Sequence, residues 1–282
     1  MDTEEIVKGT VVYKMSASGN DFVMVDGRSS PVEDWTPQRI REVCARRTGI
    51  GVDGVAVIAP GSVPGAIRFV YFNRDGDRAA MCGNASLCAA KLAARLELAP
   101  ADGMTLETDI GNITARVLSG NGELAQIGFA EVAGPTVPRI ELGPGERSIH
   151  FVTVGVPHLV VVVDALEAPS AAPEVRGKAL RSHESLGADG ANVNFLGCNN
   201  GTWRIRTYER GVEAETLACG TGAVAAAAAL ATAGHVQLPW KVQTTSGALL
   251  EISGSPSDDP LQRLTQPRLV GEARLILRGV LL

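Results

Sequence analysis

The sequence has no excess of basic residues. Its 282 residues include 26 Lys and Arg against 31 Asp and Glu, which gives a formal net charge of −5. Lys and Arg form no cluster along the chain, and a mildly acidic chain of this kind is a poor binder of nucleic acid. We therefore expect no nucleic-acid partner.

Long hydrophobic runs are also missing. No apolar run reaches the ~18 residues that a membrane-spanning helix requires. The first ten residues, MDTEEIVKGT, carry acidic side chains where a secretory signal has a basic start and an apolar stretch. We therefore expect a cytoplasmic protein without a membrane partner.

Cysteine and histidine are scarce. There are only five cysteines, and a disulfide scaffold would have more of them and an even number. Cys-x-x-Cys and His-Glu-x-x-His do not occur, and the four histidines are scattered, so we expect no metal site. No Gly-x-Gly-x-x-Gly follows an expected strand and no P-loop occurs, so a nucleotide cofactor has no support.

The sequence does contain an internal repeat. Residues 67–76 (IRFVYFNRDG) match 203–212 (WRIRTYERGV), and MCGN at 81–84 matches ACGT at 218–221. Each Cys-Gly pair precedes an Ala-rich run, which is typical of a helix. The run GAVAAAAALATA has no polar face, so its helix must be buried. We predict an α+β fold of two pseudo-symmetric, duplicated domains, each a β-sheet or open barrel wrapped around a central helix.

The duplication gives Cys82 and Cys219 the same place, at the start of an expected helix and before a glycine. A helix N-terminus presents backbone N–H groups and partial positive charge, which lower a thiol pKa and bind a carboxylate. Two such thiols on opposite faces of one Cα suit racemisation by two bases, in which a thiolate removes the proton and a thiol returns one. That chemistry requires no cofactor. A non-catalytic thiol-redox protein is a further interpretation of the same pair.

At these residues the sequence resembles the diaminopimelate epimerase family of isomerases. These cofactor-independent enzymes interconvert LL- and meso-diaminopimelate in the synthesis of lysine and peptidoglycan precursors. The strings that carry the resemblance are SGNDF (18–22), GIGVDG (49–54), FNRDG…MCGN (72–84), GVPH (155–158), GANVNF (190–195) and YERGVEAETLACGTGA (208–223). The resemblance implies an active site in the cleft between the domains. With the Pro- and Gly-rich stretch near 133, it implies a first domain of 1–133 plus 268–282 and a second of 134–267.

The resemblance also assigns site residues. It implies that Cys82 and Cys219 are the catalytic pair. Four residues at the two helix starts are implied to hold the reacting α-carboxylate: Gly83, Asn84, Gly220 and Thr221. The remaining implied substrate-binding residues are Asn20, Asn73, Asn192, Glu209 and Arg210. Arg210 suits a bidentate grip on the distal carboxylate, and Glu209 with the Asn side chains suits the distal ammonium. His158 is a packed or capping histidine or, by the resemblance, lines the site.

Three positions depart from the family pattern. The family usually has Gly-Asn-Gly-x-Arg after the first catalytic cysteine, where this chain has Ala85 and Leu87. Val156 stands where family members often have an Asn that touches substrate. We expect these changes to affect rate and substrate range more than mechanism. A cofactor-independent racemase of another amino acid, such as histidine or proline, is the alternative function. The expected partner is a small amino-acid substrate, with a homodimer as the expected assembly.

Overall fold

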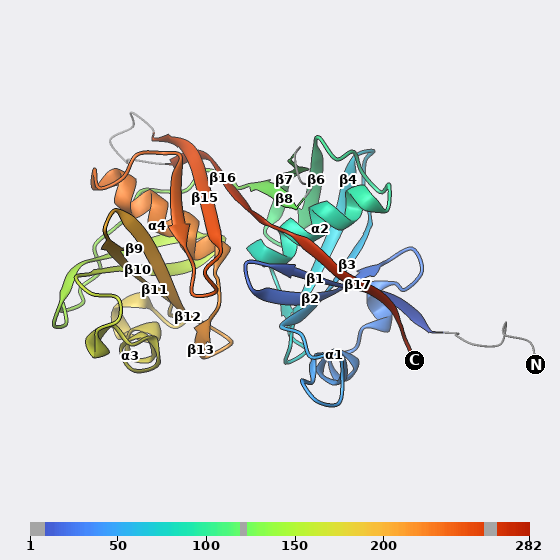
Figure 1. Ribbon diagram of the computed structural model, residues 1–282, viewed down its shortest axis with the longest axis horizontal. Coiled ribbons are helices and arrows are strands. Elements are labelled where there is room, and N and C mark those ends of the chain that lie inside the picture. The colour runs from blue at the N-terminus through green and yellow to red at the C-terminus, as the bar shows by residue number, and fades with distance from the viewer. Residues whose placement is uncertain (1–8, 119–122, 257–263) are drawn as a thin grey trace, which may run out of the picture. The chain divides into compact units, whose positions relative to one another are not determined.

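The computed structural model describes residues 9–118, 123–256 and 264–282. The chain divides into two compact units (Figure 1). The first ends at Ala125 and regains Glu272–Leu282, and the second runs from Gln126 to Gly271. The domain bounds expected from the sequence, 133/134 and 267/268, remain a prediction.

The first unit is built on a sheet in which antiparallel and parallel strand pairs alternate. Its strands are β1 (Thr10–Ala17), β2 (Asn20–Asp26), β3 (Gly54–Pro60), β4 (Ala66–Asn73), β5 (Arg78–Ala79), β6 (Met104–Thr108), β7 (Gly111–Val117) and β17 (Arg274–Leu281), and β8 (Leu124–Gly128) begins in it. The β1–β2 hairpin is antiparallel, β2–β3 is parallel, and β3–β4 is antiparallel. β4–β6 is parallel, β6–β7 is antiparallel, and the C-terminal β17 adds to β1.

The second unit repeats this pairing. Its strands are β9 (Glu146–Val154), β10 (Val156–Val163), β11 (Asn192–Asn199), β12 (Thr202–Glu209), β13 (Ala214–Thr216), β14 (Trp240–Gln243), β15 (Leu249–Pro256) and β16 (Leu264–Glu272). β9–β10 is antiparallel, β10–β11 parallel, β11–β12 antiparallel, β12–β14 parallel and β14–β15 antiparallel. β16 follows beside β15 and also pairs with β8.

The two sheets share their register as well as their order. Phe22 pairs with Gly54 where His158 pairs with Asn192. Arg68 pairs with Glu107 in the first unit, and its counterpart Arg204, 136 positions later, pairs with Gln243 in the second. The predicted α+β class with two duplicated units is therefore confirmed.

One long helix in each unit lies between the parallel strands of the crossover. The helices of the first unit are η1 (Val32–Asp34), α1 (Pro37–Cys44) and α2 (Gly83–Arg95). Those of the second are η2 (Pro169–Ala171), the π-helical turn η3 (Pro173–Gly177), α3 (Lys178–Arg181), η4 (Glu184–Leu186) and α4 (Gly220–Thr232). Residues 220–230 of α4 are all buried, because small alanines allow strands β9, β10, β11 and β15 to pack closely around it.

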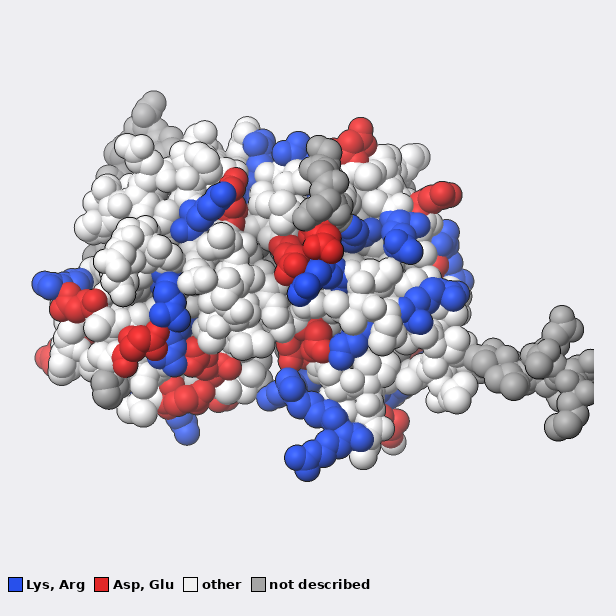
Figure 2. All heavy atoms as spheres, in the orientation of Figure 1, with Lys and Arg blue, Asp and Glu red and all other residues white. Residues whose placement is uncertain are grey.

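The opposite face of each sheet has its own hydrophobic core. In the first unit, Val55, Val57 and Phe72 pack there with Ile40 of α1. In the second unit, Leu180 of α3 packs in the corresponding core. Each sheet is thus covered on both faces, with the long helix on one face and the shorter helices on the other. None of the described helices combines the length and apolar character needed to cross a membrane. On the face drawn in Figure 2, acidic and basic side chains are intermingled over a mostly uncharged surface.

Candidate active site

Cys82 and Cys219 directly precede the two equivalent helices α2 and α4. Each has an extended backbone, with φ −134° and ψ 119° at Cys82 and φ −130° and ψ 106° at Cys219. Their carbonyls accept the first helical bonds, from Ser86 N at 2.9 Å and from Ala223 N at 3.0 Å. Neither sulfur caps its own helix. Each thiol therefore shares a helix end with first-turn N–H groups, where the helix dipole stabilises negative charge.

In the first unit, side-chain amides connect the start of α2 to the β1–β2 turn. The buried Asn84 donates from Nδ2 to Oδ1 of Asn20 at 2.9 Å. Asn20 donates from Nδ2 to Oδ2 of Asp53 at 3.0 Å. Asp53 also accepts from the backbone N–H of Asp21 at 3.3 Å. Two predicted binding residues, Asn20 and Asn84, are therefore in direct contact, and Asp53 holds them in place.

Asn73 lies at the end of β4, where its backbone closes a turn. Its N–H donates to Asp77 O at 2.9 Å, and its carbonyl accepts from Gly76 N at 3.0 Å. Across the sheet it is in register with Gly54. A Cβ on Gly54 would lie 2.5 Å from the Tyr71 hydroxyl, so only glycine fits beside Asn73.

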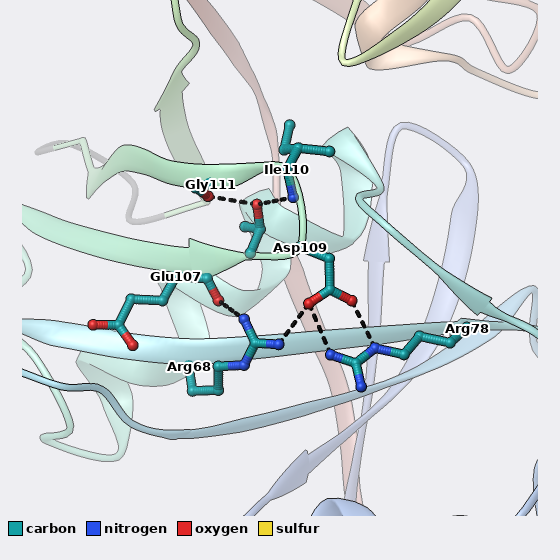
Figure 3. A network of polar contacts seen from close by, with 7 residues as sticks. Arg68, Arg78, Glu107, Asp109, Ile110 and Gly111 are labelled. Carbon is teal, nitrogen blue, oxygen red and sulfur yellow. Dashed lines mark hydrogen bonds and ion pairs between the residues drawn. The ribbon is translucent and has the colours of Figure 1, made fainter.

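Guanidinium–carboxylate pairs fix the short strand that leads to each cysteine. In the first unit, Arg78 of β5 and Arg68 of β4 both bind Asp109 (Figure 3), at 2.6 Å and 2.5 Å. The hydrogen bond from Arg78 is the main reason why the pKa of Asp109 is lowered. In the second unit, Glu215 of β13 accepts bidentate bonds from Arg206 at 2.9 and 2.6 Å. Both short strands are thus held by charge-assisted bonds just before the cysteines.

The sulfur of Cys219 lies beside a glycine and a hydroxyl. Cys219 is buried, and its Sγ is 3.6 Å from Oγ1 of Thr221. A Cβ on Gly222 would be 3.2 Å from that sulfur and would overlap Oδ1 of Asn194. Gly222 is therefore required because Asn194 occupies the space beside the first turn of α4.

Asn194 belongs to a buried polar group on strands β10, β11 and β12. Its Oδ1 accepts from Thr207 Oγ1 at 3.0 Å, and its Nδ2 lies 2.9 Å from Leu159 O and 3.2 Å from Nδ1 of His158. His158 is fully buried, which lowers the pKa of its imidazole to about 3, and the charge of Arg210 adds to that shift. His158 is therefore neutral at physiological pH, and the amide of Asn194 beside it lies next to α4.

Arg210 follows β12 and is positioned by an asparagine. Its backbone N–H donates to Oδ1 of the buried Asn192 at 2.8 Å, and its Nη1 lies 3.4 Å from Asp189 O. Glu209, the last residue of β12, accepts at its carbonyl from Glu213 N at 2.8 Å. Asn192 begins β11, so three predicted binding residues gather where β11 begins and β12 ends.

The other cysteines are in different surroundings. Burial raises the pKa of the Cys44 thiol to about 12 and also raises that of Cys88. Cys198 is exposed on β11. Cys44 and Cys88 are therefore held as thiols, as expected for small core residues.

The departures from the family pattern have local explanations. Ala85 is fully buried at the position in α2 that Gly222 holds in α4. The strand position that Asn194 occupies in the second unit is Ala56 in the first, so a smaller side chain leaves room for the methyl of Ala85. Leu87 is fully buried, where an arginine would have to bury its charge. Val156 begins β10 as Asn20 begins β2, so one side-chain amide present in the first unit is absent from the second.

The structure groups the predicted residues within each unit. Asn20 and Asn84 gather near Cys82, and Asn192, Glu209 and Arg210 lie at one end of β11 and β12. Asp53 and Asn194 were not among the predicted site residues, although both lie inside the strings that carry the family resemblance. In the described ranges, no group of three or more His, Cys, Asp or Glu is arranged to hold a metal ion.

The fold places the chain in a known structural class. It matches the structure of a phenazine biosynthesis protein of the PhzF family from Bacillus anthracis with a TM-score of 0.71, covering 98% of this chain and 100% of that one. The two are 15% identical, so this likeness concerns the fold alone.

The sequence comparisons identify the family. A family model described as diaminopimelate epimerase matches residues 12–132 and 150–259. A diaminopimelate epimerase from Gemmatimonas aurantiaca is 40% identical over 272 residues, which cover 94% of this chain and 97% of the relative. One from Hydrogenobaculum is 38% identical over 224 residues, covering 76% and 80%. The chain belongs to the diaminopimelate epimerase family.

Proposed function

We propose that this protein interconverts LL- and meso-2,6-diaminopimelate, as an isomerase of lysine and peptidoglycan precursor synthesis. The observation that carries the proposal is the pair of equivalent cysteines. Cys82 and Cys219 precede equivalent buried helices with nearly the same backbone angles, in a chain of the diaminopimelate epimerase family.

In the proposed reaction, the two thiols act as base and acid. One sulfur, as thiolate, takes the proton from the Cα of the substrate, and the other, as thiol, delivers a proton to the opposite face. The roles exchange when the reaction runs in reverse. The mechanism requires both sulfurs to reach one Cα.

The helix starts suit the reacting α-carboxylate. Four backbone N–H donors are assigned to it, those of Gly83, Asn84, Gly220 and Thr221. Removing the Cα proton moves negative charge onto this carboxylate, so prearranged N–H donors stabilise the transition state more than the ground state. The contact of Asn84 with Asn20 supports this role, because it fixes the first turn of α2.

The distal end of the substrate carries an ammonium and a second carboxylate. Arg210 is assigned to that carboxylate, with its backbone held by Asn192. Glu209 and the amides of Asn20 and Asn73 are assigned to the ammonium and its surroundings. Its counterpart in the first unit is also an arginine, Arg74, which is exposed, whereas Arg210 is half-buried.

We place the reaction in the cytoplasm. None of the five cysteines is in a disulfide, and a thiol–thiolate pair acts only while it is reduced. Oxidant should therefore inactivate the enzyme, and a reductant should restore it.

The test is a substrate panel. Purified, reduced protein is incubated with LL-diaminopimelate, histidine, proline, lysine and 2-aminopimelate, which lacks the distal ammonium, and the products are separated by chiral chromatography. We expect LL-diaminopimelate to give the meso form and the others to react at least about tenfold more slowly, because each lacks a charged group that the site binds. Racemisation of another amino acid with no reaction of diaminopimelate would contradict the proposal.

A further inference from the structure

The internal duplication provides a comparison for the buried polar group in the second unit. In the strand register, His158, Asn194 and Thr207 hold the positions that Phe22, Ala56 and Tyr71 hold in the first unit. In the first unit, Phe22 and Tyr71 make an edge-to-face aromatic contact with ring centroids 6.0 Å apart. The same architecture therefore folds with two aromatic side chains and an alanine at these positions. The polar group is not a requirement of the sheet.

The hydrogen bonds determine which way the Asn194 amide points. Leu159 O is a carbonyl and can only accept, so the side-chain atom 2.9 Å from it is the amide nitrogen. The oxygen then faces Thr207, whose hydroxyl donates to it at 3.0 Å. The second hydrogen of the amide nitrogen is directed at Nδ1 of His158, 3.2 Å away.

This orientation determines the tautomer of His158. Because Nδ1 accepts a hydrogen bond, it carries a lone pair, and the single proton of the neutral imidazole is on Nε2. The side chain is fully buried, and among the described residues no acceptor lies within hydrogen-bond distance of Nε2. A buried N–H without an acceptor is unfavourable, so an acceptor from outside the chain would improve its energy.

We propose that Asn194 is a positioning residue that holds His158 in the tautomer protonated at Nε2, so that His158 serves as a hydrogen-bond donor to the bound amino acid and not as a base. The acceptor is a carboxylate oxygen of the substrate. This role in the reaction rests on the proposed function. Two nearby features favour an anionic acceptor. The positive charge of Arg210 acts on His158. Asn194 lies beside the first turn of α4, where the helix N-terminus favours negative charge.

The tautomer is measured on the free protein, without substrate. Long-range proton–nitrogen NMR of uniformly ¹⁵N-labelled protein distinguishes a protonated from an unprotonated ring nitrogen, and His158→Phe assigns the signals. We expect Nε2 protonated and Nδ1 unprotonated from pH 6 to 9. Asn194→Asp replaces the donor with an acceptor, so we expect the proton to move to Nδ1. The second variant is Asn194→Ala, which introduces the residue found at the equivalent position of the first unit. In this variant we expect a mixture of the two neutral tautomers of His158.

The kinetic readout separates positioning from a structural role. Asn194→Asp should lower kcat by about tenfold to a hundredfold, the effect of losing a hydrogen bond to a charged group, while KM changes by less than about threefold. Asn199→Asp adds the same charge at an exposed position of the same strand and is the matched control. It should leave kcat and the tautomer unchanged.

Two outcomes would overturn the inference. One is a wild-type spectrum with Nδ1 protonated or with a charged imidazole at pH 7. The other is an Asn194→Asp protein whose tautomer changes while its kcat stays at the wild-type value. Failure of the proposed function is distinguishable, because it would appear as wild-type protein that does not act on diaminopimelate, whatever the tautomer of His158.

Discussion

Cys82 and Cys219 are 137 positions apart in the chain and occupy the same place in the fold, directly before a helix of 13 residues. Their backbone angles differ by no more than 13°, from ψ values of 119° and 106°. The sheet around each helix has the same sequence of parallel and antiparallel pairs. A duplicated unit thus supplies two thiols in like surroundings, which the proposed mechanism uses as base and acid.

Replacing either cysteine should remove most of the activity. For Cys82→Ser and for Cys219→Ser we expect kcat/KM on diaminopimelate to fall by about 10²–10⁴-fold, because a serine hydroxyl is a far weaker acid and base at neutral pH. The exposed Cys198→Ser is the matched control and should behave as wild type. Steady-state kinetics measures all three, and a single cysteine variant of full activity would exclude the two-thiol mechanism.

Gly222→Ala should destabilise the protein more than a substitution at the equivalent position of the first unit. The new methyl would overlap Oδ1 of Asn194, which is held by Thr207 and cannot simply turn away. We expect the free energy of unfolding to fall by about 1–3 kcal/mol, the usual range for overpacking, together with a loss of activity. Ala85→Gly, at the same helical position in the first unit, should cost no more than about 1 kcal/mol. Urea denaturation of both variants provides the comparison, and equal effects would contradict this explanation.

Arg210→Ala should weaken substrate binding. Losing a charge-assisted bond to the distal carboxylate should raise the KM for diaminopimelate by about tenfold to a hundredfold. Arg74→Ala, at the exposed counterpart position in the first unit, should change KM by less than about twofold. If both variants bind diaminopimelate equally well, the distal carboxylate is held elsewhere.

His158 should make stability depend on pH below neutrality. Its pKa is lowered by burial to about 3 in the folded state, against 6.5 in an exposed histidine. Between these values the unfolded chain binds a proton that the folded chain does not, so stability falls as pH falls. From pH 6.5 to 5, wild type should lose about 1.7 kcal/mol more free energy of unfolding than His158→Phe. Replacing the exposed His235 with Asn is the control and should leave the pH dependence as in wild type. The same loss in wild type and His158→Phe would show that His158 is accessible to protons when folded.

Much of the fold could be predicted from the sequence, because the repeat fixes the order of strands and helix in both halves. The cysteines and their glycines could also be recognised, since each is part of a local motif. Asn194 and Asp53 could not, because their importance depends on which residues the register brings opposite them. The same reason applies to Ala85 and Gly222, because the equivalent strand position is Ala56 in the first unit and Asn194 in the second. Local patterns do not contain such cross-strand relations.

The central claim is that two thiols invert the configuration at one Cα of the substrate and leave the rest of the substrate unchanged. Proton NMR of LL-diaminopimelate with reduced protein in D₂O tests it directly. We expect loss of the Cα–H signal as deuterium enters, together with formation of the meso isomer, and both should stop in Cys82→Ser and Cys219→Ser. A folded wild-type protein with free thiols that leaves the Cα–H signal of LL-diaminopimelate intact would contradict the account.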